Sequence, residues 1–164
     1  MSYQISDEPI ETPWRAYVVN PGAPLLAEML CGSWLSLPWF AFNAWAMGSP
    51  TKRKEIALCL ASLAGTIVMG MIWVWLVRSK TIENRTIIQL LLLVIVTWKL
   101  AMAYVIDIVQ SRTFHVYEYY GGPVRSSTYV IATGFILRDT VIGLFDDPLW
   151  VIIVMGDVWG AIAS

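Results

Sequence analysis

Two apolar stretches of this sequence carry ionisable residues near their centres. Residues 86–110 contain Lys99, and residues 128–145 contain Arg138 and Asp139. Lys99 lies about eleven residues from the end of the first stretch and Asp139 about eleven from the start of the second, so in antiparallel helices both lie about 16 Å below a membrane surface. Because an isolated charge is costly at that depth, we expect Lys99 to pair with Asp139 inside a helical bundle, with Arg138 close by.

The same helix faces extend this predicted polar centre. At 100° per residue, Gln89, Lys99, Asp107 and Gln110 fall within an arc of roughly 80°. Asp157 becomes a further buried acid if the apolar C-terminal piece returns into the membrane. The predicted buried polar cluster therefore consists of Lys99, Asp107, Arg138, Asp139 and Asp157. Two interpretations remain open: a structural ion pair that fixes helix register, and a functional centre that relays protons or ions or docks a partner.

The overall composition predicts that these stretches lie in a membrane. Of the 164 residues, 57% are hydrophobic and only 14% are charged, against roughly 25% charged in soluble domains. Most of the nine tryptophans fall near the ends of apolar runs, where their rings anchor at the lipid headgroups. We therefore predict an all-α integral membrane protein, expected in a bacterial inner (cytoplasmic) membrane. The net charge of −1 argues against a nucleic-acid partner.

Four transmembrane helices are expected, over residues 24–47, 56–77, 86–110 and 128–145. A short apolar helix over 149–163 follows, and it is a fifth thin span, a re-entrant helix or an extension of the fourth. Asp147 is expected to cap this helix, with Pro148 at its first position. The predicted organisation is a polar N-terminal tail over residues 1–22 and a single helical membrane domain over residues 23–164.

The first expected helix carries a polar face. Glu28, Gly32, Ser36 and Asn43 recur at spacings of four, four and seven residues, which places them on one side of a helix. Pro38 is expected to kink that helix. A polar face in a lipid-embedded helix should contact protein or water, so Glu28, Ser36 and Asn43 predict either a helix–helix contact or a ligand or ion path.

Residues 111–127, between the third and fourth expected helices, read as an aromatic loop outside the lipid. The expected recognition surface of this loop consists of His115, Tyr117, Glu118, Tyr119 and Tyr120. The alternation of aromatic residues is also compatible with a short hairpin that closes at Gly121 and Gly122. His115 and Glu118 are too few to form a zinc site, so no metal or cofactor is expected.

The sequence contains no nucleotide-binding glycine loop and no recognisable nucleophile–base pair, so we do not expect an enzyme. The favoured hypothesis is a binding protein whose helices and loop associate with a membrane partner, as an accessory subunit or immunity-type protein would. The alternative is a homo-oligomeric conduit for protons or small ions that uses the buried Lys/Arg/Asp cluster. A third, less favoured, is a lipid-modifying or small-molecule enzyme using Glu28, His115, Glu118 or Asp157. The expected partners are the lipid bilayer and either another membrane protein or a second copy of this chain.

Overall fold

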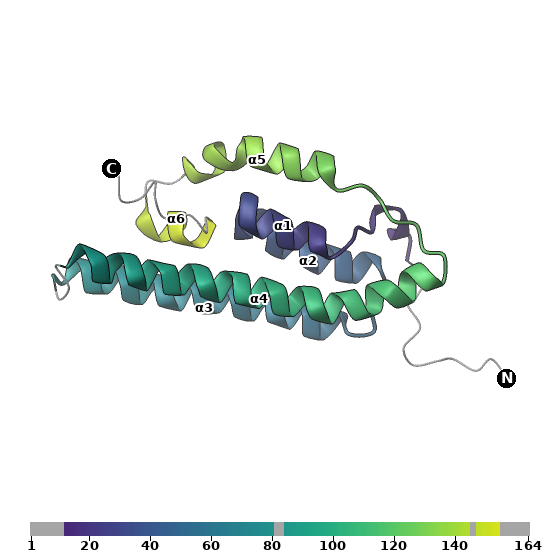
Figure 1. Cartoon of the computed structure of the whole chain (residues 1–164), viewed down its shortest axis with the longest axis horizontal. Helices are drawn as coiled ribbons and strands as arrows, with labels where there is room; N and C mark the ends of the chain where they lie inside the picture. The colour runs from purple at the N-terminus through teal and green to yellow at the C-terminus, as the bar shows by residue number, and fades with distance from the viewer. Residues whose placement is uncertain (1–11, 81–83, 145–146, 155–164) are drawn as a thin grey trace.

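The computed structural model describes residues 12–80, 84–144 and 147–154, and within these ranges every secondary-structure element is a helix (Figure 1). A short 3-10 helix, η1, precedes six α-helices. Their bounds are η1 Arg15–Tyr17, α1 Gly22–Leu30, α2 Ser33–Ala46, α3 Lys52–Arg78, α4 Arg85–Tyr119, α5 Thr128–Ile142 and α6 Pro148–Val154.

The two longest helices, α3 and α4, form an antiparallel pair along the long axis of the molecule (Figure 1). They contain 27 and 35 residues, and both are long and apolar enough to cross a membrane. The helices approach closely at Gly65, where an added Cβ would lie 2.6 Å from the Trp98 ring. The Trp98 indole N–H also donates to the carbonyl of Ser62 at 3.4 Å. Among the described helices, only α3 and α4 meet the length that a full span requires.

The first predicted span is divided into two helices, and the division falls at Gly32. This residue has φ 96° and ψ 177°, a region that essentially only glycine occupies. Its N–H donates to the carbonyl of Ala27 at 3.0 Å, and its own carbonyl accepts from Leu35 and Ser36 in the first turn of α2. Pro38, where the kink was expected, lies inside α2 without ending it. The chain therefore reverses direction and forms an α1–α2 hairpin.

The arms of this hairpin are short. With nine and 14 residues, α1 and α2 are about 14 and 21 Å long, against roughly 30 Å for the hydrocarbon core of a bilayer. The hairpin lies along the α3–α4 pair, and its turn lies near the middle of the long helices (Figure 1). A single kinked span was thus the wrong prediction for residues 24–47.

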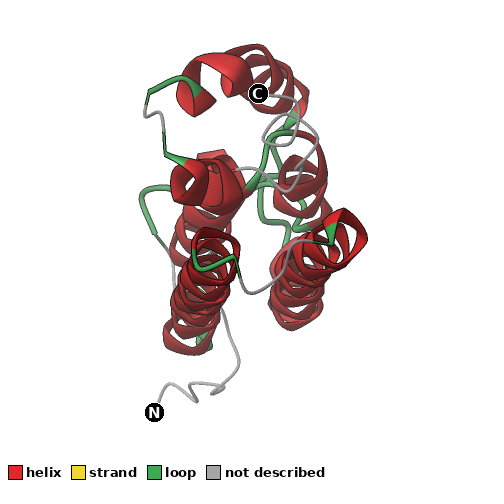
Figure 2. Cartoon of the chain, turned by 90° about the vertical axis from the view of Figure 1, so that its left-hand side faces the viewer, coloured by secondary structure: helices red, strands yellow, loops and turns green. Residues whose placement is uncertain are grey.

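The helices stack in three layers, which are visible from the side and from the end (Figures 1 and 2). The α3–α4 pair forms one layer, α1, α2 and α6 form the middle, and α5 lies outermost and packs on α1 and α6. Helix α5 approaches the turn between α1 and α2 closely at Gly134. An added Cβ at this residue would collide with Leu35 and lie 3.2 Å from the sulfur of Cys31. The middle layer therefore separates α5 from α4.

Helix α6 begins as the sequence predicts. The side chain of Asp147 accepts from the N–H of Leu149 at 2.9 Å, and Pro148 is the first helical residue. The helix packs on α3 at Gly70, where an added Cβ would lie 3.4 Å from Ile152. The later part of the predicted helix, residues 155–163, lies outside the described residues.

The predicted loop over residues 111–127 is helical in its first half, because α4 continues to Tyr119. Thr113, Phe114 and Tyr117 are buried at helical spacing, so this end of α4 has a packed face. The Tyr117 hydroxyl lies 3.1 Å from the carbonyl oxygens of both Arg15 and Pro123. The loop and hairpin predictions were therefore wrong for residues 111–119. Tyr117 is buried, whereas the other four members of the expected recognition surface, His115, Glu118, Tyr119 and Tyr120, are exposed.

Candidate functional site

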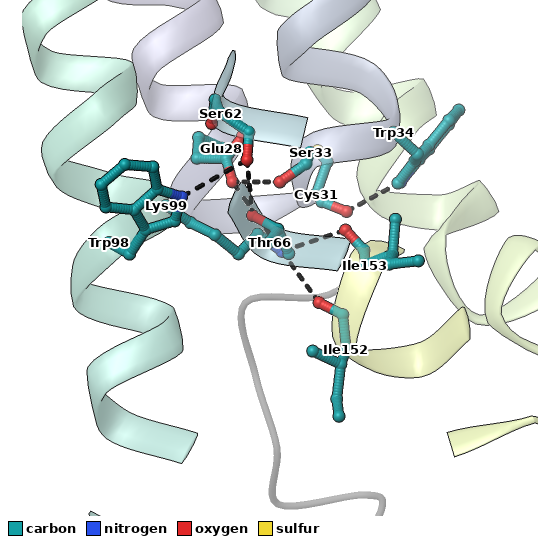
Figure 3. Close-up of polar contacts among 10 residues, drawn as sticks. All are labelled: Glu28, Cys31, Ser33, Trp34, Ser62, Thr66, Trp98, Lys99, Ile152 and Ile153. Carbon is teal, nitrogen blue, oxygen red and sulfur yellow. Dashed lines mark hydrogen bonds and ion pairs between the residues drawn. The ribbon is translucent and has the colours of Figure 1, made fainter. Parts of the chain in front are cut away.

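Lys99 lies at the centre of a buried ionic site (Figure 3). It is only 1% exposed, and its Nζ lies 4.0 Å from Oε1 of Glu28, which is 3% exposed. The same ammonium donates to the carbonyl oxygens of Ile152 at 3.3 Å and Ile153 at 3.1 Å. The site thus joins α4 to α1 and to α6.

The predicted pairing of Lys99 with Asp139 is wrong. Asp139 is exposed on α5, and α1 packs against both α4 and α5, so it occupies the place where the two residues were expected to meet. Arg138 is half-buried and donates to the carbonyl of Leu30 at 3.5 Å. Asp107 is also half-buried, and Asp157 lies outside the described residues. Among the described members of the predicted cluster, Lys99 alone is buried.

The polar face predicted for the first helix lies entirely inside the protein. Glu28, Ser36 and Asn43 are all buried. Oε1 of Glu28 accepts from the hydroxyl of Ser33, across the turn of the hairpin. Asn43 exchanges two hydrogen bonds of 3.0 Å with the backbone of Val19 and donates a third to the side chain of Gln110.

A second buried polar cluster surrounds Glu55, in the first turn of α3. Gln110 donates to Oε2 of Glu55 at 2.9 Å and to the carbonyl of Phe40 at 3.0 Å. The hydroxyls of Ser49 and Thr51 both donate to Oε1 of Glu55. Both carboxylate oxygens are therefore hydrogen-bonded. The cluster joins α2, α3 and α4 through hydrogen bonds, which indicates a structural role.

Sequence reasoning missed Glu55. The residue directly follows three consecutive cations, Lys52, Arg53 and Lys54, and so does not stand out in the sequence as a buried acid. A usable signal was present, because Glu55, Cys59, Ser62, Thr66 and Gly70 recur at spacings of four, three, four and four, and all five are buried in α3. An acid that continues a face of small residues on a membrane-length helix should be expected to point inward.

The Glu28 site differs from the Glu55 cluster because its hydrogen bonds are incomplete. Among the described residues, Oε2 of Glu28 and Oγ of Ser36 are buried and have no hydrogen-bond partner. An unpaired buried polar atom costs free energy and in native proteins calls for an explanation. Oε2 of Glu28 is a carboxylate oxygen that is available to bind a proton or to accept a donor.

Backbone and hydroxyl groups contact both charges of this site. Lys99 donates to two carbonyl oxygens of α6. Glu28 is hydrogen-bonded to Ser33, the first residue of α2, and negative charge is stabilised at a helix N-terminus.

A cavity of about 320 Å³ adjoins the site, between α2, α3 and α6. Ser33 and Ile153 line this cavity, and the same two residues hydrogen-bond Glu28 and Lys99. The remaining lining is apolar and includes Trp34, Cys59 and Trp150. Within the described residues, no group of three or more His, Cys, Asp and Glu side chains is placed to hold a metal ion.

Comparison with protein-family models, with curated proteins and with solved structures finds no match to this chain.

Proposed function

We propose that this chain is an integral membrane protein that conducts protons, with the Glu28–Lys99 pair as the ionisable step of the path. The observation that carries the proposal is the unpartnered Oε2 of Glu28, buried beside a lysine. Lys99 opposes the passage of other cations, so the proposal is limited to protons.

The surfaces of α3 and α4 support a membrane location. In the most apolar 18-residue stretch of each helix, only 22% of α3 and 28% of α4 is buried inside the protein. The core helix of a soluble protein is mostly buried. Large apolar side chains point outward along both helices, among them Leu60, Trp75 and Leu93. We propose that α3 and α4 are full spans and that the α1–α2 hairpin is re-entrant. Helix α5, at 15 residues, is about 22 Å long and would form a short crossing at most.

Buried polar groups lead from one end of the molecule to the proposed proton site. We name this set the polar seam; it consists of Glu55, Gln110, Asn43, Ser36, Glu28 and Lys99, all buried. Along α4, the eleven residues from Lys99 to Gln110 correspond to about 16 Å. The seam therefore places polar groups beside one half of the proposed path. Hydrogen bonds join Asn43, Gln110 and Glu55, whereas Oγ of Ser36 has no partner among the described residues.

Among the described residues, the other half is apolar. Beyond Lys99, towards the start of α4, Leu92 and Ile95 pack against Ile152 of α6. We propose that protons pass this cluster either by displacement of α6 or along a contact with a second copy of the chain, as in a homo-oligomeric conduit.

Reconstituted vesicles test the proposal. With a potassium gradient and valinomycin, the wild-type chain should admit protons, which a pH-sensitive dye inside the vesicles reports. Glu28→Gln should abolish the flux, because an amide cannot exchange a proton with the seam at neutral pH. Asp139→Asn provides a control, since Asp139 is exposed and should not affect the rate. Tight vesicles that contain folded wild-type protein would contradict the proposal.

A second candidate function is association with a membrane partner, as an accessory subunit or immunity-type protein. Helix α5 favours it, because Gly134 is the one buried residue in a helix whose every residue is described. Tyr129 and Ile136 are 84% and 76% exposed. Purification in mild detergent followed by mass measurement should then recover a complex, which Ile136→Asp should disrupt. Recovery of the chain alone, or of copies of itself, would contradict this candidate.

A further inference from the structure

We infer that the cavity between α2, α3 and α6 binds one acyl chain of a membrane phospholipid. The inference rests on the membrane location proposed above, but not on proton conduction. The cavity volume of about 320 Å³ is at the lower end of the range of roughly 300–1,000 Å³ in which proteins bind small ligands. Its walls are Leu37 and Ala41 of α2, Cys59 and Leu63 of α3, and Ile153 and Val154 of α6.

The polar atoms of the lining residues are already engaged, so the cavity offers a ligand only hydrocarbon surface. The hydroxyl of Ser33 donates to Glu28. The indole N–H of Trp34 donates to the carbonyl of Cys31 at 2.7 Å, and that of Trp150 donates to the carbonyl of Val141 at 3.0 Å. A buried cysteine such as Cys59 behaves as a small apolar group. These contacts exclude a polar ligand and favour an unbranched apolar chain.

The mouth of the cavity faces the surface that lipids would cover. Ile56 and Leu60 form part of its lining, and they are 36% and 62% exposed on α3. Leu60 lies eight residues from the start of α3 at Lys52, or about 12 Å along a spanning helix, which is the depth of acyl chains. The cavity is therefore continuous with the lipid-facing surface of a candidate span. This continuity selects a phospholipid of the surrounding bilayer as the occupant.

The cavity and the ionic site share two residues. Ile153 contributes its side chain to the cavity wall, while its carbonyl accepts from Lys99. Ser33 lies in the wall at the other side and donates to Glu28. An acyl chain in the cavity would pack against the side chain of Ile153 and so help to hold α6, whose backbone Lys99 also contacts.

Native mass spectrometry of the full chain tests the inference. The protein is reconstituted in vesicles of phosphatidylcholine and phosphatidylglycerol, extracted in mild detergent, and stripped of loosely bound lipid by stepwise activation. The wild-type chain should retain one phospholipid. Ala41→Phe and Cys59→Phe, which place a ring in the cavity from two different helices, should each reduce that retention at least tenfold. Val94→Phe adds the same ring on the exposed surface of α4 and should leave retention unchanged.

Two results would overturn the inference: no phospholipid retained by the wild-type chain, or equal retention by Ala41→Phe, Cys59→Phe and Val94→Phe. If both cavity variants aggregate, the wild-type chain is labelled with a phosphatidylcholine whose acyl chain carries a diazirine. Adducts should then concentrate on residues 37–41 and 59–63 over residues 90–94. Equal labelling of these three segments overturns the inference. Absence of label from residues 37–41 and 59–63 also overturns it, and is the result expected if the chain's own C-terminal residues occupy the cavity.

Failure of the inference is distinguishable from failure of the proposed function. Glu28→Gln should lose proton flux and retain the phospholipid. A chain that floats with vesicles but retains no phospholipid overturns the cavity assignment alone. A chain that does not float with vesicles overturns the membrane location on which both proposals depend.

Discussion

Nζ of Lys99 on α4 lies 4.0 Å from Oε1 of Glu28 on α1, and this buried ion pair connects the α1–α2 hairpin, near its turn, to the longest described helix. The contact also brings α6 into place, because Lys99 donates to two of its carbonyl oxygens. Three helices therefore depend on one ammonium group.

Removal of either charge should destabilise the fold. Glu28→Ala and Lys99→Ala each remove one member of the buried Glu28–Lys99 ion pair, and breaking such a pair typically costs about 3–5 kcal/mol. The double variant should lose less than the sum of the two, because the residues are in contact. Denaturant unfolding in detergent measures both effects, with Asp139→Ala as an exposed control that should change stability by about 0.5 kcal/mol or less. Additive losses would show that the pair is not a unit.

Gly32→Ala should disrupt the hairpin turn. The backbone of Gly32, at φ 96° and ψ 177°, is strained for any residue with a Cβ, and such strain costs about 1–3 kcal/mol. Thermal unfolding should report the loss. Gly143→Ala is a matched control, because Gly143 has φ −70° and an added Cβ would come no closer than 3.5 Å to its neighbours. Equal effects of the two substitutions would argue against the turn geometry.

Gly65→Ala should separate α3 from α4. The new methyl group would lie 2.6 Å from the Trp98 ring, and overpacking of this kind costs about 1–3 kcal/mol. Trp98→Leu should restore part of the loss in the double variant, since it removes the ring. Gly70→Ala is the control, because its nearest neighbour would be Ile152 at an ordinary contact distance of 3.4 Å. The free energy of unfolding of the four variants tests this close approach. If Trp98→Leu does not restore stability to Gly65→Ala, the predicted contact between Gly65 and Trp98 is contradicted.

Tyr117→Phe should loosen the N-terminal segment. The substitution removes the hydroxyl that lies 3.1 Å from the carbonyl oxygens of Arg15 and Pro123, a loss of about 1 kcal/mol. Hydrogen exchange should accelerate at the amide of Arg125, which donates to Val18 at 2.8 Å in the same region. Tyr120→Phe, at an exposed position, should leave that exchange rate unchanged. Unchanged protection of Arg125 in Tyr117→Phe would count against the role of the hydroxyl.

Apolar runs were sufficient to locate the long helices and the start of α6. Residues 56–77 and 86–110 lie within α3 and α4, because an unbroken apolar stretch of that length has few alternatives to a helix. The central position of Lys99 in its apolar run also predicted that it is buried, which is confirmed. These conclusions depend on local pattern, which is what a single sequence contains.

The pairing of Lys99 with Glu28 could not be predicted from local sequence pattern. The prediction assumed that consecutive apolar runs pack side by side, which would bring Asp139 to Lys99. The hairpin made by α1 and α2 intervenes, and its turn depends on the backbone of Gly32, which composition does not reveal. Glu28 was identified as part of a polar face, but a kink was expected at Pro38, whereas the chain turns at Gly32. The incomplete hydrogen bonding of Glu28 is likewise visible only once the neighbouring helices are in position.

The shortness of α1 and α2 has a consequence for how the protein is made. The ribosome synthesises these helices before α3 and α4, and neither is long enough to be held in a bilayer as a span. Among the described residues, the counter-charge of Glu28 is Lys99, which is synthesised later. With the membrane location proposed above, the α1–α2 hairpin would stay at the membrane surface during translation and enter after α3 and α4 have inserted, so that these two helices would fold later than the helices that follow them in the chain.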